Sequence, residues 1–167
     1  ITCPISQALI GSEYCKCIQC KYNYDYESLI EWLEKQNKKV LYTFEPGGTT
    51  LGKKLRKILL TNELVDLSPQ AEALLYAADR AQHVANVIRP ALKRNWIVIS
   101  DRYLDSSIAY QGAGRILDPK DIERISMWAT DSLIPTVTIF LDQDPANGIR
   151  RIIDLDRLES EPLSFHT

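Results

Sequence analysis

Acidic, basic, hydroxyl and amide side chains follow one another closely in the middle of this chain. Residues 99–111 read Ile-Ser-Asp-Arg-Tyr-Leu-Asp-Ser-Ser-Ile-Ala-Tyr-Gln. The apolar run Trp96–Ile99 predicts a buried strand, so Asp101 and Arg102 are expected at its carboxyl end, where open α/β sheets bind their ligands. A guanidinium at that place can bind an anion. This chemistry suits a small anionic substrate.

Two further blocks accompany this segment: Thr43-Phe-Glu-Pro-Gly-Gly-Thr-Thr-Leu-Gly52 and Glu72-Ala-Leu-Leu-Tyr-Ala-Ala-Asp-Arg-Ala-Gln-His83. Together the three blocks resemble the thymidylate kinase family of bacterial and archaeal type, over roughly residues 29–165. The resemblance implies a P-loop NTPase-type α/β fold with three layers (α/β/α) and a mostly parallel sheet, similar to nucleoside monophosphate kinases. It also implies ATP-dependent phosphorylation of dTMP to dTDP, with ATP and Mg²⁺ as cofactors.

The resemblance assigns the phosphate end of the substrate to two arginines and one carboxylate. Arg80 and Arg102 are similar to the pair that binds the monophosphate and orients the base. Asp101 resembles the acidic residue near the phosphates and magnesium, and is the one candidate Mg²⁺ ligand. From the residue types alone, a surface ion pair between Asp79 and Arg80 remains an alternative. A turn-capping role remains an alternative for Asp101.

The same resemblance assigns the base and sugar. Tyr76 lies one helical turn before Arg80 and resembles the aromatic residue on which thymine stacks, although an aromatic at helical spacing is also typical of a core. Ser107 and Gln111 are expected to hydrogen-bond the base edge. Tyr110 resembles the residue that crowds the sugar 2′ position and favours deoxyribose. Glu45 and Pro46, in the first block, complete the expected substrate-binding set.

One stretch imitates a phosphate-binding loop without matching it. Gly47–Lys54 has the spacing G-x-x-x-x-G-K, but Lys54 stands where a hydroxyl residue would hold magnesium. We therefore interpret it as the family's second block, which usually has Arg where Phe44 stands. Residues 1–28 contain no glycine-rich loop and are atypical for the family.

A basic segment near the end of the chain resembles the lid of bacterial thymidylate kinases. It carries Arg150, Arg151 and Arg157, of which Arg150 and Arg157 are candidates to stabilise the migrating phosphoryl group. A solvated, arginine-rich turn is the alternative. Beyond it, we expect the family's last helices and last strand to be missing from the sequence.

Composition points to one domain, residues 1–167, of ordinary globular type. The chain is 45% hydrophobic and 25% charged, with a net charge of −2. This balance gives no sign of a nucleic-acid or membrane partner, so we expect a cytoplasmic protein. Cys15, Cys17 and Cys20 are close in sequence, but a thiolate metal site would require a fourth ligand at familiar spacing, and incidental thiols are favoured.

Hydrophobic periodicity and capping residues place the elements that must position these side chains. Helices are predicted from Leu29 to about Asn37, across Leu51–Leu59, from Ser68 to about Asn95, and from Asp118 to about Ala129. Strands are predicted at 40–43, 96–100 and 136–141. Strands separated by helices imply a parallel sheet covered on both faces.

Three functions remain open at this level. The resemblance favours a dTMP kinase, while the lack of a recognisable phosphate loop favours a relic that binds dTMP without phosphorylating it. A kinase for a different nucleoside or nucleotide is the third. Family members are commonly homodimers, so a homodimer is a further expectation from the resemblance.

Overall fold

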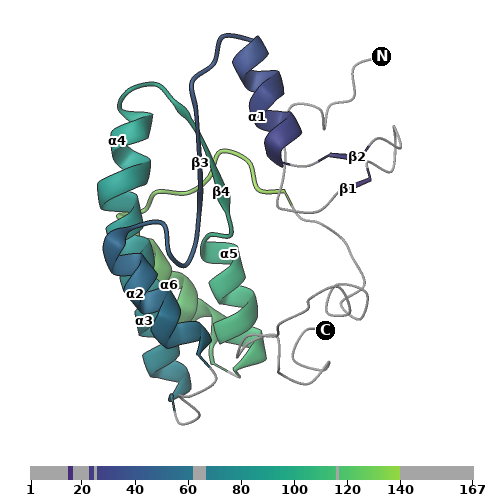
Figure 1. Ribbon diagram of the computed structural model, residues 1–167. Helices are drawn as coiled ribbons and strands as arrows, with labels where there is room; N and C mark the ends of the chain where they lie inside the picture. The colour runs from purple at the N-terminus through teal and green to yellow at the C-terminus, as the bar shows by residue number, and fades with distance from the viewer. Residues whose placement is uncertain (1–14, 17–22, 25, 62–66, 116, 140–167) are drawn as a thin grey trace.

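The computed structural model describes residues 15–16, 23–24, 26–61, 67–115 and 117–139 (Figure 1). A two-residue antiparallel pair, β1 (Cys15–Lys16) and β2 (Asn23–Tyr24), precedes the α/β region. That region begins with α1 (Tyr26–Lys35) and β3 (Val40–Phe44), which agree with the helix and strand predicted there. Asn37, two residues after the last residue of α1, has a positive φ of 56°, the left-handed conformation that often follows a helix end.

Two parallel strands form the centre of the described region. β3 pairs with β4 (Ile97–Asp101), and the register runs from Val40 opposite Ile97 to Phe44 opposite Asp101. Leu29 and Leu33 of α1 pack against one side of these strands, contacting Val40, Ile97 and Ile99. Because the strands are parallel and end in register, the residues that follow them meet at one edge.

The connection between the two strands consists of helices. α2 (Thr50–Leu60) begins at Thr49, whose hydroxyl accepts a hydrogen bond from the Gly52 amide at 2.8 Å. α3 (Pro69–His83) begins as predicted, with Ser68 as N-cap and Pro69 in the first turn. Leu59 of α2 and Tyr76 of α3 are buried against each other.

The long helix predicted from Ser68 to about Asn95 is interrupted. α3 passes into a π-helical segment, η2 (Val84–Ile88), and then into α4 (Arg89–Leu92). Pro90 has no amide hydrogen and its ring clashes with the carbonyl one turn earlier, so the ordinary i→i−4 ladder cannot continue. The Arg89 amide instead donates to Val84 O, five residues back.

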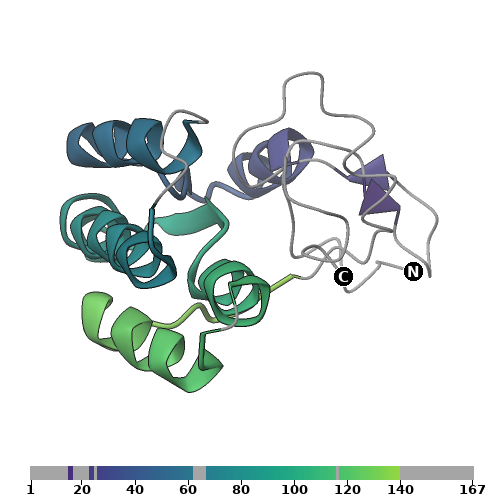
Figure 2. The same cartoon turned by 90° about the horizontal axis from the view of Figure 1, so that it is seen from below.

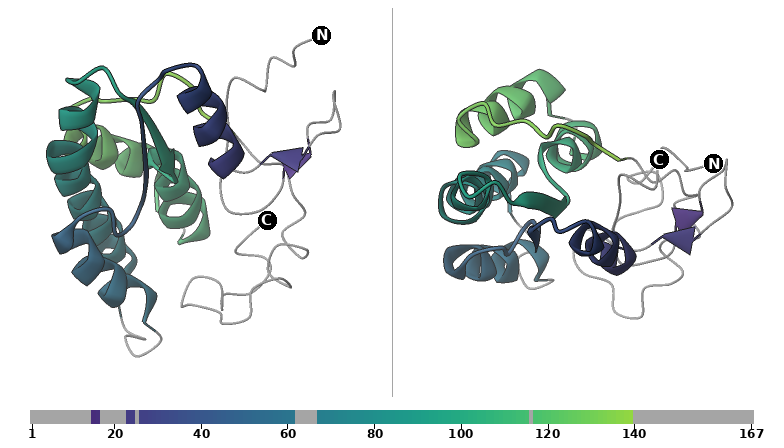
Figure 3. Two further views of the ribbon diagram at one scale, coloured as in Figure 1. Left: turned by 45° about the horizontal axis from the view of Figure 1, so that its top comes forward. Right: turned by 90° about the horizontal axis from the view of Figure 1, so that it is seen from above.

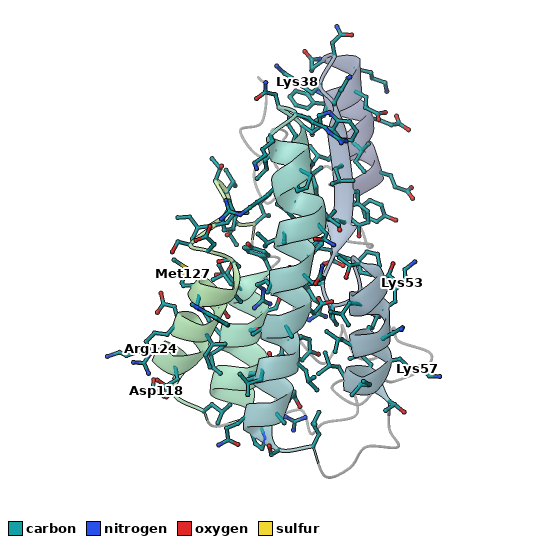
Figure 4. The ribbon with its side chains drawn as sticks, turned by 90° about the vertical axis from the view of Figure 1, so that its left-hand side faces the viewer. Lys38, Lys53, Lys57, Asp118, Arg124 and Met127 are labelled. Atoms are coloured by element: carbon teal, nitrogen blue, oxygen red, sulfur yellow. The ribbon has the colours of Figure 1, made fainter. Side chains whose placement is uncertain are left out.

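After β4 the chain forms α5 (Leu104–Ser107), the π-helical segment η3 (Ile108–Gly114) and α6 (Pro119–Ala129). Seen from below, α2, α3 and α6 lie side by side, and α1 lies apart from that row (Figure 2). The views in Figure 3 show the same arrangement. α3 is the middle helix, and Lys53 and Lys57 point outward from α2 (Figure 4).

The sequence predicted no element directly after Asp101, where α5 and η3 carry Ser107, Tyr110 and Gln111. One local prediction differs from the structure. The strand predicted at 136–141 is not formed by its described part, residues 136–139. A strand requires a neighbour for its ladder of hydrogen bonds. Within the described residues, β4 pairs only with β3.

Within the part of the chain that the structure describes, no helix combines the length and apolar character needed to cross a membrane.

Candidate functional site

Two side chains of α3, Arg80 and His83, hold the turn that follows β3. Glu45 is buried and its carboxylate is shared: Oε2 accepts from Arg80 Nε at 2.8 Å, and Oε1 lies 2.8 Å from His83 Nδ1. The other ring nitrogen of His83 lies 2.6 Å from Thr43 Oγ1, at the end of the strand. The backbone amide of Glu45 donates to Asp101 O at 3.0 Å. Glu45 is therefore fixed between the two strand ends.

Arg80 lies inside the protein, with 2% of its surface exposed. Beside its bond to Glu45, it donates to Ser126 Oγ at 3.2 Å. It also donates to Tyr103 O at 3.2 Å and to Ser107 Oγ at 3.1 Å. Asp79 is buried too, so the alternative of a surface ion pair for Asp79 and Arg80 is wrong. Arg80 joins α3 to α5, to α6 and to the turn after β3.

The face of α3 that carries Arg80 also carries Tyr76 and Glu72, at helical spacing. Opposite it, Ser107 and Gln111 follow one another at the same spacing. Arg80 bonds Ser107, and Gln111 Nε2 donates to Glu72 Oε1 at 2.8 Å. Tyr76 is buried and lies between these two contacts along α3. The predicted base-binding residues are thus brought together by two antiparallel helical segments.

Arg102 has a different setting, immediately after β4. Arg102 is exposed and its backbone has a positive φ of 65°. Its guanidinium lies 5.2 Å from the centroid of the Tyr110 ring. For a residue with a Cβ atom this conformation is strained, and such strain is typical of functional sites. Partial desolvation lowers the pKa of Arg102, but Tyr110, Asp101 and Tyr76 together raise it above its ordinary value. The guanidinium stays charged at the strand ends.

The first block serves a packing role that excludes it as a phosphate loop. The Gly47 amide donates to the buried Asp79 Oδ1 at 3.2 Å, so it faces a carboxylate. A side chain at Gly52 would place its Cβ in contact with Asp79, and one at Gly48 would overlap the His83 ring. Burial and the neighbouring Glu45 raise the pKa of Asp79. A phosphate loop requires amides that point to the ligand, which supports our interpretation of this stretch.

Residue Phe44, which stands where the family usually has Arg, is exposed at the end of β3. Arg56 of α2 lies with its guanidinium 5.9 Å from the Phe44 ring centroid, and it donates to Pro46 O at 2.9 Å. The guanidinium of Arg56 therefore lies close to the position where the family usually has an arginine. Pro46 itself is buried in the turn and follows a cis peptide bond.

Asp101, the one candidate Mg²⁺ ligand from the sequence, is the last residue of β4. Among the described residues, no three His, Cys, Asp or Glu side chains gather into a metal site. Mg²⁺ is commonly held by one or two carboxylates together with substrate phosphates and water, so a single carboxylate at the strand ends fits the ion. Arg150, Arg151 and Arg157 lie outside the described residues, as does the larger part of the cysteine-rich segment.

Sequence reasoning missed several residues of this site. Glu72 and His83 bracket the predicted residues of α3, and the helical spacing from Tyr76 and Arg80 was the signal that could have identified them. Arg115, which approaches Glu72 Oε2 at 3.3 Å, and Ser126 come from segments with no recognisable motif.

Sequence comparisons with known proteins all point to one family. A sequence model of the family described as Thymidylate kinase matches residues 25–167. The chain is 53% identical over 145 residues to the thymidylate kinase of Bifidobacterium longum (strain DJO10A), covering 84% of this chain and 70% of that protein. It is 51% identical over 142 residues to that of Clavibacter sepedonicus, covering 83% and 67%. It is 47% identical over 138 residues to that of Cutibacterium acnes, covering 83% and 68%. The chain belongs to the thymidylate kinase family.

Proposed function

We propose that this protein transfers the γ-phosphoryl group of ATP to dTMP and forms dTDP. The observation that carries the proposal is the convergence of the predicted substrate residues. Glu45 and Arg102 directly follow the paired carboxyl ends of β3 and β4, and Ser107 and Gln111 of the α5–η3 segment face the side of α3 that carries Tyr76. The family supports dTMP as the substrate, and this arrangement supports these residues as its binding site.

The residues divide the substrate between them. Arg102 is exposed at the strand ends and binds the monophosphate. Tyr76 stacks on the base, and Ser107 and Gln111 bond its edge. Tyr110 lies beside Arg102, where it crowds the sugar 2′ position. Arg80 orients Glu45 and Ser107 through direct hydrogen bonds, so its contribution is the arrangement of the site.

Phosphoryl transfer depends mainly on positioning and on neutralising charge. Asp101 is the residue that would hold Mg²⁺, and a bound ion would supply positive charge against the phosphates there. Arg150, Arg151 and Arg157 are proposed to close over the phosphates as a lid, with Arg150 and Arg157 nearest the transferred group. No phosphate loop is present among the described residues, so the ATP phosphates are assigned to none of them.

Three coarser proposals accompany the activity. Residues 1–167 form one kinase domain, atypical over residues 1–28. The domain acts in the cytoplasm on dTMP and ATP, with no nucleic acid or membrane as partner. It assembles as a homodimer, a proposal supported by Trp128 of α6, which is 85% exposed. Light scattering during size-exclusion chromatography measures the mass of the assembly and so distinguishes a dimer from a monomer.

The activity is tested by following dTDP formation from dTMP with ATP and Mg²⁺, using dUMP, dCMP and UMP as controls. Turnover selective for dTMP supports the proposal. Faster turnover of another monophosphate favours the kinase of different specificity. Binding of dTMP with no turnover favours the relic, for which the described residues offer one argument, the absence of a phosphate loop among them.

A further inference from the structure

A buried carboxylate faces the amide that is expected to contact the base. Glu72 is fully buried and Gln111 is 1% exposed. Gln111 Nε2 donates to Glu72 Oε1 at 2.8 Å, and Arg115 Nε approaches the same carboxylate at 3.5 and 3.3 Å. The carboxylate of Glu72 therefore lies between two donors, the amide of Gln111 and the guanidinium of Arg115.

An ionised carboxylate accepts hydrogen bonds and donates none, whereas a primary amide has one donating end and one accepting end. The NH₂ end of Gln111 must therefore face Glu72. Its carbonyl oxygen, Oε1, points to the other side of the amide group and accepts no hydrogen bond from the described residues. Glu72 thus decides which end of Gln111 is offered to a ligand.

The two pyrimidine classes differ at the group that this oxygen would meet. Thymine and uracil carry an N–H donor at N3 and a carbonyl at position 4. Cytosine carries an acceptor at N3 and an amino group at position 4. An offered carbonyl oxygen accepts from the N3–H of thymine but faces a lone pair on cytosine. A mismatched buried polar group is costly, so the orientation of one amide is enough to discriminate.

We propose that Glu72, held by Arg115, is a positioning residue that fixes the amide of Gln111 with its oxygen toward the base, and so selects thymine over cytosine. The proposal rests on the proposed function, since it concerns the base of the same substrate. Glu72 itself does not touch the ligand. Its effect is confined to the donor and acceptor pattern that Gln111 presents.

The direct variant is Glu72→Gln, which keeps the shape and leaves one accepting oxygen. Arg115 competes for that oxygen as a charged donor, so the new amide turns its NH₂ toward Gln111 and reverses it. The ratio of dTMP to dCMP affinity, measured by calorimetry, should fall about tenfold to a hundredfold. The ratio of dTMP to dUMP should stay unchanged, because thymine and uracil share the same edge. A general structural defect would lower all three affinities together.

Two controls show whether the effect of Glu72→Gln acts through Gln111. Glu123→Gln makes the same change on the exposed face of α6 and should leave every ratio as in the wild type. The substitution Gln111→Met removes the amide that contacts the base. Adding Glu72→Gln to that variant should therefore not change its ratio of dTMP to dCMP affinity any further. A ratio that is unchanged by Glu72→Gln alone, or that shifts equally in the Gln111→Met background, would overturn the proposal.

A measurement on the wild type needs no substitution. In NMR spectra, the side-chain NH₂ signals of Gln111 should exchange slowly with water before any ligand is added, and should move little when dTMP binds. Rapid exchange of those protons would overturn the inferred orientation. A wild-type chain that binds no dTMP would contradict the proposed function, while slow exchange of the amide would still support the fixed orientation of Gln111.

Discussion

Two arginines of the site, Arg80 and Arg102, have opposite environments. Arg80 is buried and donates to Glu45, Ser107, Ser126 and the carbonyl of Tyr103. Arg102 is exposed, has a strained backbone and lies against one aromatic ring. Motif resemblance treats the two as a pair, but the structure gives them different surroundings. We propose that the buried arginine holds the site in shape and that the exposed one binds a phosphate.

The largest expected effect comes from removing the buried member. Arg80→Ala leaves the carboxylate of Glu45 buried and takes away the partner of two serine hydroxyls. Loss of one partner of a buried ion pair costs about 3–5 kcal/mol, so the free energy of unfolding should fall by that amount. Urea denaturation measures the change. A loss below about 1 kcal/mol, the range of surface ion pairs, would show that Arg80 does not organise the interior.

For Arg102, the exposed arginine, we expect a large loss of dTMP affinity and little change in stability. Arg102→Ala removes a charged contact to phosphate, worth about 1.5–3 kcal/mol, so dTMP should bind roughly ten to a hundred times more weakly. The free energy of unfolding should change by no more than about 0.5 kcal/mol, as is usual at exposed positions. Calorimetric titration and urea denaturation of one preparation give both numbers. Unchanged dTMP affinity would remove Arg102 from the phosphate site.

The neighbour of Arg102 should affect only the sugar. Tyr110→Ala opens space beside the guanidinium, so the preference for dTMP over its ribonucleotide counterpart should fall, by about tenfold if the ring acts as a steric gate. Comparing the affinities of the two monophosphates measures this ratio. Tyr110→Phe keeps the ring and is the control for the hydroxyl group. An unaltered ratio in Tyr110→Ala would reject the gate.

The sequence predicted the elements on which this division rests, but not all of their details. Capping residues and hydrophobic spacing located α1, α2, α3 and α6, and short apolar runs located β3 and β4. These signals are local, and local signals survive folding when packing agrees with them. The path of η2 was not anticipated, although Pro90 was a visible cause.

The site was predicted as a set of residues, and its interior was not. The resemblance to the family proposed Tyr76, Arg80, Arg102, Ser107, Tyr110 and Gln111 as site residues. It could not show that Arg80 is buried or that Glu72 and His83 hold its neighbours, because those facts depend on how α3 packs against the strand ends and α5. Side chains that act through contacts between distant segments have no fixed spacing in sequence.

The smallest expected effect concerns pH and the buried Asp79. Burial, and then Glu45, raise its pKa above the ordinary value of 3.8, so the native state holds this proton more tightly than the unfolded state does. Its contribution to stability is therefore present at low pH and is lost as the pH rises from about 3.8 through the raised native value.

Asp79→Asn keeps an acceptor for the Gly47 amide and removes the titration. Its stability should fall less than that of the wild type between pH 4 and pH 7, measured by urea denaturation at a series of pH values. Glu123→Gln, at an exposed position, should follow the wild-type curve. If Asp79→Asn also followed that curve, Asp79 would have no raised pKa in the native protein.

The location of the substrate is tested most directly by titrating dTMP into the wild-type chain and following its backbone amides by NMR. Our account predicts that the largest shifts fall on residues 45–48, on 76–80 and on 101–111, the segments that meet at the ends of β3 and β4 and along α3. Shifts concentrated elsewhere, for example along α1 or the outer face of α6, would contradict it. So would a chain that binds dTMP no better than dCMP.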